Sequence, residues 1–299
     1  MMAKRKALMI IASLYAFMSM NAQGVASLNI NPDPAGMAMA GTSVALRADA
    51  YAMENNIAAT ALESPKMAAA VGFGMWQPGA ANARLMSAQG FYRIGERLSV
   101  AFQYKGFSYS EYSVVSDDGR VKGAFTPKEL TAGVGVAYRM TDNFSAGFNI
   151  RMISSVMASD AKGSAFGADI AVKYENNRLH AGLSVCNLGT KIKYGDISYS
   201  LPMSAKLGVA YYVNNLTLST EADYFLRKGP SAGIGAEYTF WDILSLRAGY
   251  HYGKAAGVLA SYASAGIGLS AYGIRLNFSY ITGPSTLGNT LLFSLGYVF

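Results

Sequence analysis

From Lys66 to the end of the chain, apolar residues alternate with polar or small residues at a period of two. Successive side chains of a strand point to opposite faces, so this alternation predicts strands with one apolar face. In the last segment that face consists of Leu291, Phe293, Leu295, Tyr297 and Phe299. About fourteen such segments follow one another. We expect them to begin near residues 67, 84, 97, 128, 143, 163, 178, 202, 216, 230, 243, 259, 272 and 288.

The face opposite the apolar residues consists mostly of Gly, Ser and Ala, with a few charges of both signs. A soluble sheet would expose this face to bulk water and would carry far more charge on it. A narrow or plugged barrel lumen needs small residues and few ions. We expect these charges to form ion pairs in the lumen, and an ion-selective pore is the alternative. The inward charges are Lys105, Arg139, Arg151, Asp169, Lys173, Lys206, Glu221, Asp223, Glu237, Arg247 and Arg275.

The connections between the segments alternate between short and long, as the two ends of a transmembrane barrel require. Short gaps such as Thr141-Asp142 and Asn214-Asn215 contain residues that tolerate left-handed backbone angles. The other gaps are mostly longer: Ser108–Pro127 is the longest, and Arg227–Gly229 departs from the trend. The pattern predicts an all-β, antiparallel transmembrane β-barrel of about 14 strands over residues 66–299. Its short turns and both of its termini would face the periplasmic side of a bacterial outer membrane.

The composition agrees with a lipid-exposed barrel, because 52% of the residues are hydrophobic and only 14% are charged. After the first 22 residues, no stretch approaches the roughly 20 apolar residues of a membrane helix. Residues 1–22 have the pattern of a signal peptide, in which Lys4-Arg5-Lys6 precedes the apolar run Ala7–Met18 and a small-residue cleavage site. Part of the formal charge of +7 belongs to this leader. The other basic residues form no stripe, so we expect no nucleic-acid partner.

Residues 23–65 do not alternate and are rich in Ala and Met. They are too apolar for a solvated tail, and they directly precede the first predicted strand. We expect them to fold inside the lumen as a hatch, because the many small inward residues would leave room for it. The alternative is an amphipathic segment that lies on the periplasmic mouth of the barrel.

Six residues of this segment form a motif, namely Gly36, Met37, Gly41, Asp49, Asn55 and Asn56. The motif resembles the opening of the PorV/PorQ family of the FadL-like barrel superfamily, which commonly shows Met-Gly-Gly, then Asp-Ala, then Asn-Pro-Ala. This chain has Ala40 for one glycine and Ile57 for the proline. The resemblance implies a fourteen-stranded outer-membrane barrel with an N-terminal plug. In the PorV/PorQ branch it implies a role in type IX secretion through cargo or partner proteins. In the FadL branch it implies passage of hydrophobic molecules.

Two further segments are candidates for contact with other proteins. The end of the chain resembles the signal by which outer-membrane barrels are handed to their insertion machinery, and its residues are Phe299, Tyr297, Leu295 and Phe293. The loop Ser108–Pro127 is a candidate partner surface, because long loops are often functional, and a mobile lid is the alternative. Its candidate residues are Tyr109, Tyr112, Asp117, Asp118 and Arg120.

The sequence carries no catalytic constellation. His180 and His251 are the only histidines and Cys186 is the only cysteine, and their scatter predicts filling of the lumen rather than catalysis or a zinc site. We expect no enzyme activity and no cofactor. We predict an outer-membrane barrel that acts through protein partners in secretion or surface attachment. The alternative is a transporter of a hydrophobic ligand, which would need an apolar pocket beneath the external loops. A general diffusion porin is disfavoured by the small inward residues and the expected plug.

Overall fold

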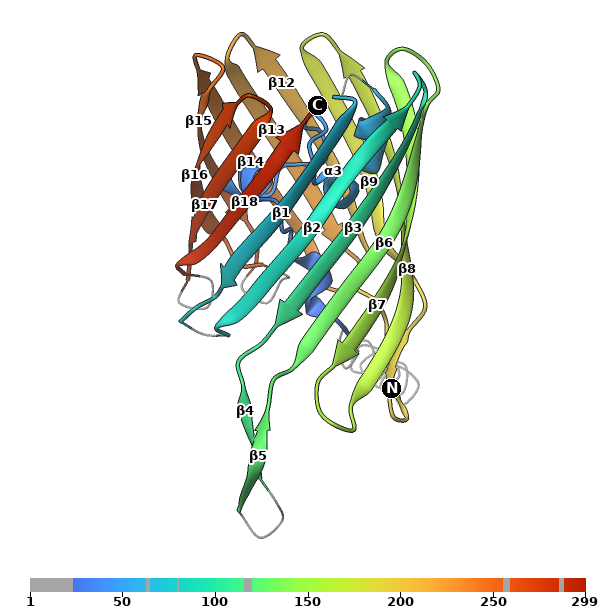
Figure 1. Cartoon of the computed structure of the whole chain (residues 1–299), viewed down its shortest axis with the longest axis vertical. Helices are drawn as coiled ribbons and strands as arrows, with labels where there is room; N and C mark the ends of the chain where they lie inside the picture. The colour runs from blue at the N-terminus through green and yellow to red at the C-terminus, as the bar shows by residue number, and fades with distance from the viewer. Residues whose placement is uncertain (1–23, 63–64, 80, 116–119, 255–258, 285–287) are drawn as a thin grey trace, which may run out of the picture.

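The computed structural model describes residues 24–62, 65–79, 81–115, 120–254, 259–284 and 288–299. The predicted signal peptide, residues 1–22, lies outside the described residues. Fourteen strands form a closed antiparallel barrel around an N-terminal segment with short helical turns (Figure 1). Within the described ranges, no helix combines the length and the apolar character needed to cross a membrane.

The fourteen barrel strands confirm the expected fold class, and each begins within three residues of its expected position. They are β1 (Met67–Trp76), β2 (Ala83–Ile94), β3 (Leu98–Ser108), β6 (Lys128–Arg139), β7 (Phe144–Val156), β8 (Lys162–Asn176), β9 (Leu179–Gly189), β12 (Ser204–Val213), β13 (Leu216–Phe225), β14 (Gly229–Phe240), β15 (Leu244–Tyr252), β16 (Tyr262–Ala271), β17 (Ile274–Thr282) and β18 (Thr290–Val298).

The last strand closes the barrel against the first. β18 pairs antiparallel with β1 from Ala68 opposite Val298 to Met75 opposite Leu291. The seam extends to the final residue, because Met67 and Phe299 exchange backbone hydrogen bonds of 2.8 and 2.9 Å. Closure satisfies the backbone groups that a free sheet edge would expose to lipid.

The outward face of the wall is an apolar band, as the alternation predicted. Its exposed side chains include Phe102, Val134, Ile150, Phe166, Ile234 and Leu295. The short connections gather at one end of the barrel, which we call the turn end, and the longer ones at the other, the loop end (Figure 1). One turn is shifted from its expected place at Ser270-Ala271 to Tyr272-Gly273, where both residues have positive φ angles of 53° and 80°.

Two small hairpins at the loop end were not expected. β4 (Tyr112–Val115) pairs with β5 (Val121–Phe125) and extends away from the barrel (Figure 1). β10 (Ile192–Tyr194) pairs with β11 (Ile197–Tyr199) in the connection between β9 and β12. The loop Ser108–Pro127 therefore contains a hairpin, which we call the arm (Tyr112–Phe125).

Residues 24–62 lie inside the barrel, and we call this segment the hatch. It contains η1 (Ala26–Asn29), α2 (Pro34–Ala38), α3 (Ala52–Asn55) and η2 (Ile57–Ala61). Gly24, at its start, donates a backbone hydrogen bond of 3.2 Å to the Ser200 carbonyl at the loop end. Phe299 lies at the turn end. The described hatch therefore begins at the opposite end of the barrel from Phe299, because it crosses the lumen before β1 begins. The periplasmic position of both termini stays a prediction.

Candidate functional site: the plugged lumen and the loop end

Inward-facing glycines allow the hatch backbone to lie directly against the wall. A Cβ atom at Gly182 would lie 2.0 Å from the Val44 carbonyl oxygen, and one at Gly249 would lie 2.6 Å from the Ala40 nitrogen. Any larger side chain at these positions would displace the hatch. Further wall glycines in contact with the hatch are Gly133, Gly135, Gly147, Gly208, Gly233, Gly235 and Gly266. The small inward residues thus provide the room that the sequence predicted.

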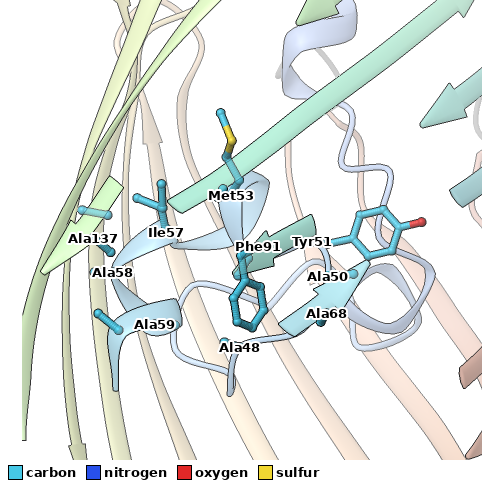
Figure 2. Close-up of a cluster of buried hydrophobic side chains, with 14 of the residues drawn as sticks. Ala48, Ala50, Tyr51, Met53, Ile57, Ala58, Ala59, Ala68, Phe91 and Ala137 are labelled. Atoms are coloured by element: carbon cyan, nitrogen blue, oxygen red, sulfur yellow. The ribbon is translucent and has the colours of Figure 1, made fainter. Parts of the chain in front are cut away.

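An apolar cluster anchors the second half of the hatch to the wall. Met53 and Ile57 of the hatch are almost fully buried, together with Phe91 of β2 (Figure 2). Figure 2 shows Ile57 and Ala58 next to Ala137 of β6. Ile57 occupies the position of the family proline, and its side chain fills the space above wall glycines on β6 and β7. The Ile57 side chain therefore packs the hatch against β6 and β7.

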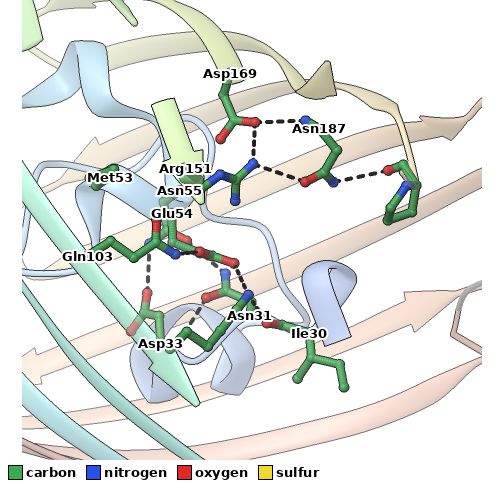
Figure 3. Close-up of polar contacts among 12 residues, drawn as sticks. Ile30, Asn31, Asp33, Met53, Glu54, Asn55, Gln103, Arg151, Asp169 and Asn187 are labelled. Carbon is green, nitrogen blue, oxygen red and sulfur yellow. Dashed lines mark hydrogen bonds and ion pairs between the residues drawn. The ribbon is translucent and has the colours of Figure 1, made fainter. Parts of the chain in front are cut away.

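Asn31, Asp33 and Asn55 connect the two halves of the hatch. Asn31 Nδ2 donates to Asn55 Oδ1 at 2.7 Å, and Asn55 Nδ2 donates to Asp33 Oδ2 at 2.9 Å (Figure 3). The other Asp33 oxygen accepts the Ala35 N–H and caps the start of α2. Burial raises the pKa of Asp33, although the hydrogen bond from Asn55 opposes that rise. The hatch is therefore a small folded unit with its own polar core.

Glu54 connects this unit to the wall. Its Oε1 lies 2.7 Å from Lys105 Nζ on β3, and its Oε2 accepts a hydrogen bond from Gln103 on the same strand. Lys105 Nζ also donates to the Ile30 carbonyl at 3.1 Å. Because the Glu54–Lys105 pair is buried, loss of one partner would leave an uncompensated charge, which typically costs about 3–5 kcal/mol.

The turn at residues 44–46 is held by two wall side chains and by Asn56 of the hatch. Lys173 Nζ donates to the carbonyls of Ala45 and Leu46, each at 2.5 Å. The Val44 N–H donates to Glu221 Oε2 at 2.8 Å. Asn56 Nδ2 donates to the Val44 carbonyl at 3.0 Å, and also to a carbonyl of β8. Alternation had placed Lys173 and Glu221 inside the barrel but could not identify their hatch partners.

The other motif residues form a tight turn of the hatch. Gly36 lies against the Asp33 carboxylate, where a Cβ would come within 2.7 Å of Oδ2, and Met37 is 2% exposed. Gly41 has a φ of 80° and donates its N–H to the Gly36 carbonyl at 2.9 Å. Ala40, which replaces a family glycine, also adopts a left-handed φ of 62°. The turn therefore forms despite the substitution, at a cost of about 1 kcal/mol.

Asp49 is the motif residue with an unusual protonation equilibrium. Its Oδ1 accepts the Tyr51 N–H at 2.8 Å. Desolvation in the lumen and the nearby Asp33 carboxylate raise the pKa of Asp49 to about 7, against the opposing charges of Arg247 and Arg275. The fold therefore disfavours the charged form of Asp49.

Some of the inward charges of the wall form ion pairs in the lumen, whereas Asp223 and Arg275 form none with a described residue. Arg151 Nη2 lies 2.5 Å from Asp169 Oδ1, and Arg247 pairs with Glu237. A register shift between β8 and β9 gives Asn187 a left-handed φ of 61°, and its N–H donates to Asp169 at 2.7 Å. Beside these groups, between hatch and wall, lies a cavity of about 30 Å³ lined by charged and amide side chains. It has room for water rather than for an apolar ligand.

The two histidines and the cysteine lie apart on the wall. His180 on β9 contacts Tyr212 in a tilted arrangement, with 4.5 Å between ring centroids, and its Nδ1 lies 3.5 Å from Glu175. His251 on β15 stacks on Tyr262. Cys186 is buried on β9. Among the described residues, no three or more His, Cys, Asp or Glu side chains gather as metal ligands would.

The loop-end mouth of the barrel is covered by the β10–β11 hairpin. Ile192 of β10 is fully buried and packs with Val25 and Leu28 of the hatch and with Leu201. Tyr109 lies nearby at the base of the arm, where its hydroxyl donates to Glu129 at 3.2 Å. The start of the hatch and this hairpin thus form one apolar cluster at the loop end of the lumen.

The arm carries the rest of the candidate partner loop. Tyr112 is exposed, and its ring centroid lies 5.8 Å from that of Phe125 on β5. Val114 and Val121 are also exposed, and Arg120 lies at the start of β5. Asp117 and Asp118 fall outside the described residues. The structure therefore separates Tyr109, at the barrel wall, from Tyr112, on the projecting hairpin.

A closed fourteen-stranded barrel with an apolar outer band and a plugged lumen defines an outer-membrane barrel with a FadL-like fold. A family model described as "Type IX secretion system protein PorV" matches residues 19–230. The chain therefore belongs to the PorV family, whose members are non-enzymatic outer-membrane barrels of type IX secretion. No curated protein matches the chain.

Solved structures of outer-membrane barrels have the same fold. The Ralstonia pickettii toluene transporter TbuX has a TM-score of 0.66 and 14% identity, and the match covers 91% of this chain and 99% of that one. The CymD monoaromatic hydrocarbon channel has a TM-score of 0.66 and 13% identity, with 93% and 99% covered. A Pseudomonas aeruginosa FadL homologue has a TM-score of 0.59 and 14% identity, with 89% and 98% covered. At these identities the likeness concerns the fold alone.

Proposed function

We propose that this barrel is a closed docking component of protein secretion, whose protein partners bind at the loop end. The observation that supports this function is the filled lumen, in which wall glycines, ion pairs and hydrogen bonds hold the hatch in place. The alternative, a transporter of hydrophobic molecules, requires an apolar route through the lumen. A cavity between hatch and wall, of about 30 Å³, has no room for such a molecule.

In this proposal the arm is one partner surface. Tyr112, Val114 and Val121 expose apolar side chains on a hairpin that projects beyond the barrel, where lipid does not cover them. Exposed apolar residues outside the bilayer favour protein contact. The unpaired edges of a two-stranded hairpin can also pair with a strand of another protein.

The proposal places the loop end outside the cell, and cysteine labelling in intact cells tests this orientation. The native Cys186 is buried and should not react. We expect a membrane-impermeant maleimide to label the Lys122→Cys variant, whose cysteine would lie on the arm. It should not label Trp241→Cys, at a turn-end residue that is 78% exposed. The reverse pattern would contradict the orientation.

Affinity isolation of the tagged full chain from native membranes tests the partner surface. A triple variant of the arm, Tyr112→Ser with Val114→Ser and Val121→Ser, should lose at least nine-tenths of the secretion-machinery or cargo proteins that the native chain retains. Ile197→Ser is the matched control, because Ile197 is an exposed apolar residue on the other loop-end hairpin. Equal recovery of partners by the native chain and the triple variant would exclude the arm as a partner surface.

A further inference from the structure

The outward charges of the described barrel strands are all positive and lie in one hydrogen-bonded row. Arg84 pairs across the sheet with Ser108, and Ser108 pairs with Lys128. The row continues through Val156 to Lys162. The other charged residues of these strands alternate into the lumen. Because the strands are tilted, the row runs obliquely along the loop-end part of β2–β8 (Figure 1).

A groove begins between the first two of these cations. It has a volume of about 720 Å³ and is lined by Arg84 and Lys128, and further from the loop end by Met86, Tyr104 and Leu130. Its floor is Gly106, which pairs with Met86 on one side and Leu130 on the other. The atoms nearest to a Cβ at Gly106 would belong to the Tyr104 ring, at 3.5 Å or more. The missing side chain thus leaves a shallow channel between Met86 and Leu130, bordered by the Tyr104 ring and hydroxyl, below a pair of cations.

This combination fits an anionic amphiphile. A guanidinium binds phosphate oxygens in bidentate fashion, and an ammonium binds them as a point charge. Arg84 and Lys128 lie on strands about 10 Å apart, within reach of one headgroup for such long side chains. Four residues along β3, counted from Gly106 past Tyr104, span about 14 Å of apolar wall. This length can hold part of an acyl chain.

Two acidic residues, Glu111 and Glu129, also line the groove, but neither pairs with its cations. Glu129 is buried and accepts the Tyr109 hydroxyl. Glu111 is exposed on the loop side of the groove. Neither Arg84 nor Lys128 forms an ion pair with a described residue. The loop-end outward positions of β13–β17 carry no comparable cations, but uncharged residues such as Tyr224, Pro230, Tyr252 and Thr282.

From these observations we infer that the groove binds one phosphorylated lipid of the outer leaflet. Arg84 and Lys128 hold its phosphate, and an acyl chain lies over Gly106. The inference rests on the proposed orientation, in which the loop end reaches the outer leaflet, and is independent of the secretion partners. A bound lipid at this position would also lie directly beneath the arm.

Binding of bisphosphorylated lipid A to the delipidated full chain, counted by native mass spectrometry, tests the inference. We expect binding at least tenfold weaker in the double variant Arg84→Gln with Lys128→Gln, and in Gly106→Leu, which fills the channel. A double variant of exposed loop-end cations elsewhere, Lys228→Gln with Lys254→Gln, should bind within twofold of the native chain. Heat-modified mobility on gels confirms that each variant is a folded barrel.

Two further measurements identify the chemistry of the ligand. Dephosphorylated lipid A should bind at least tenfold more weakly than the phosphorylated form, and inorganic phosphate at the same concentration should not displace the lipid. Native-like binding by the Arg84/Lys128 variant or by Gly106→Leu would overturn the inference. So would equal binding of the dephosphorylated lipid, or displacement by inorganic phosphate alone. The maleimide labelling above tests the orientation separately.

Discussion

The two hairpins at the loop end share a strand pairing but have opposite surroundings. Ile192 of β10 is fully buried against the start of the hatch, whereas Val121 of the arm is 67% exposed. The first hairpin belongs to the closed interior, together with the hatch and the wall glycines. The second makes few contacts with the barrel. The contrast indicates that the interior is closely packed, whereas the arm is exposed for contact with other molecules.

The largest expected effect concerns a wall glycine that contacts the hatch. Gly249→Leu should lower the free energy of unfolding by about 3 kcal/mol, because its side chain would overlap the backbone of Met39 and Ala40. Chemical unfolding in detergent micelles measures the change. The same substitution in the arm, Gly123→Leu, meets open space and should change stability by less than about 0.5 kcal/mol. Equal losses of stability in Gly249→Leu and Gly123→Leu would contradict the contrast between the packed interior and the exposed arm.

A second pair of substitutions compares the β10–β11 hairpin with the arm. Ile192→Ala should destabilise the protein by about 2 kcal/mol, because it removes a buried side chain from the cluster over the hatch. It should also speed hydrogen exchange of residues 25–30. Val121→Ala removes an exposed side chain and should leave both measurements unchanged. If Ile192→Ala changed stability and hydrogen exchange as little as Val121→Ala, the β10–β11 hairpin would not protect the start of the hatch.

The third prediction concerns pH and Asp49. The pKa of about 7 in the folded chain lies above the usual value, so the fold disfavours the charged form. The loss of folding free energy from ionised Asp49 is absent below about pH 4, grows as the pH rises toward 7, and is complete above pH 7. Asp49→Asn should therefore stabilise the hatch at pH 8 by on the order of 1–2 kcal/mol, after allowance for partial solvent access, and should have little effect at pH 4.

Unfolding curves of native and Asp49→Asn chains at the two pH values give this difference. Asp33, Arg247 and Arg275 all interact with the Asp49 carboxylate, so the difference between the two chains measures the charged side chain together with these interactions. A variant that is less stable at pH 8 than the native chain would contradict the assignment.

The smallest effect concerns the turn of the hatch motif. Gly41→Ala places a side chain at a φ of 80° and should cost about 1 kcal/mol, although the space there is open to ordinary contact. Gly123→Ala in the arm, where φ is not positive, is the control. A neutral Gly41→Ala would show that the turn does not require the glycine.

The wall could be predicted closely from the sequence because each strand has one face against lipid. Phe102, Val134 and Ile150 point outward as the alternation required. Turn residues such as Asn214, with a φ of 50°, marked the short connections. The composition of residues 23–65 indicated the hatch, and its boundaries in the sequence remain a prediction.

The features that were not predicted depend on contacts between distant segments. β10 and β11 have three residues each, too few for a period of two to be recognised. The register shift at Asn187 is stabilised by Asp169 and Arg151, which come from other strands. Alternation placed Lys105 and Lys173 inside, but only the folded hatch determines the carbonyl groups that they bind. Nothing in the pattern indicated that the hatch begins at the loop end.

The central claim is that the hatch closes the lumen, so that the barrel acts through its surfaces. Single-channel recording of the purified full chain in planar bilayers tests it most directly. We predict no steady conductance above the bare bilayer, because the described hatch packs against the wall glycines and carries buried ion pairs and hydrogen bonds across the lumen. A stable open-channel current from the native chain would contradict the account.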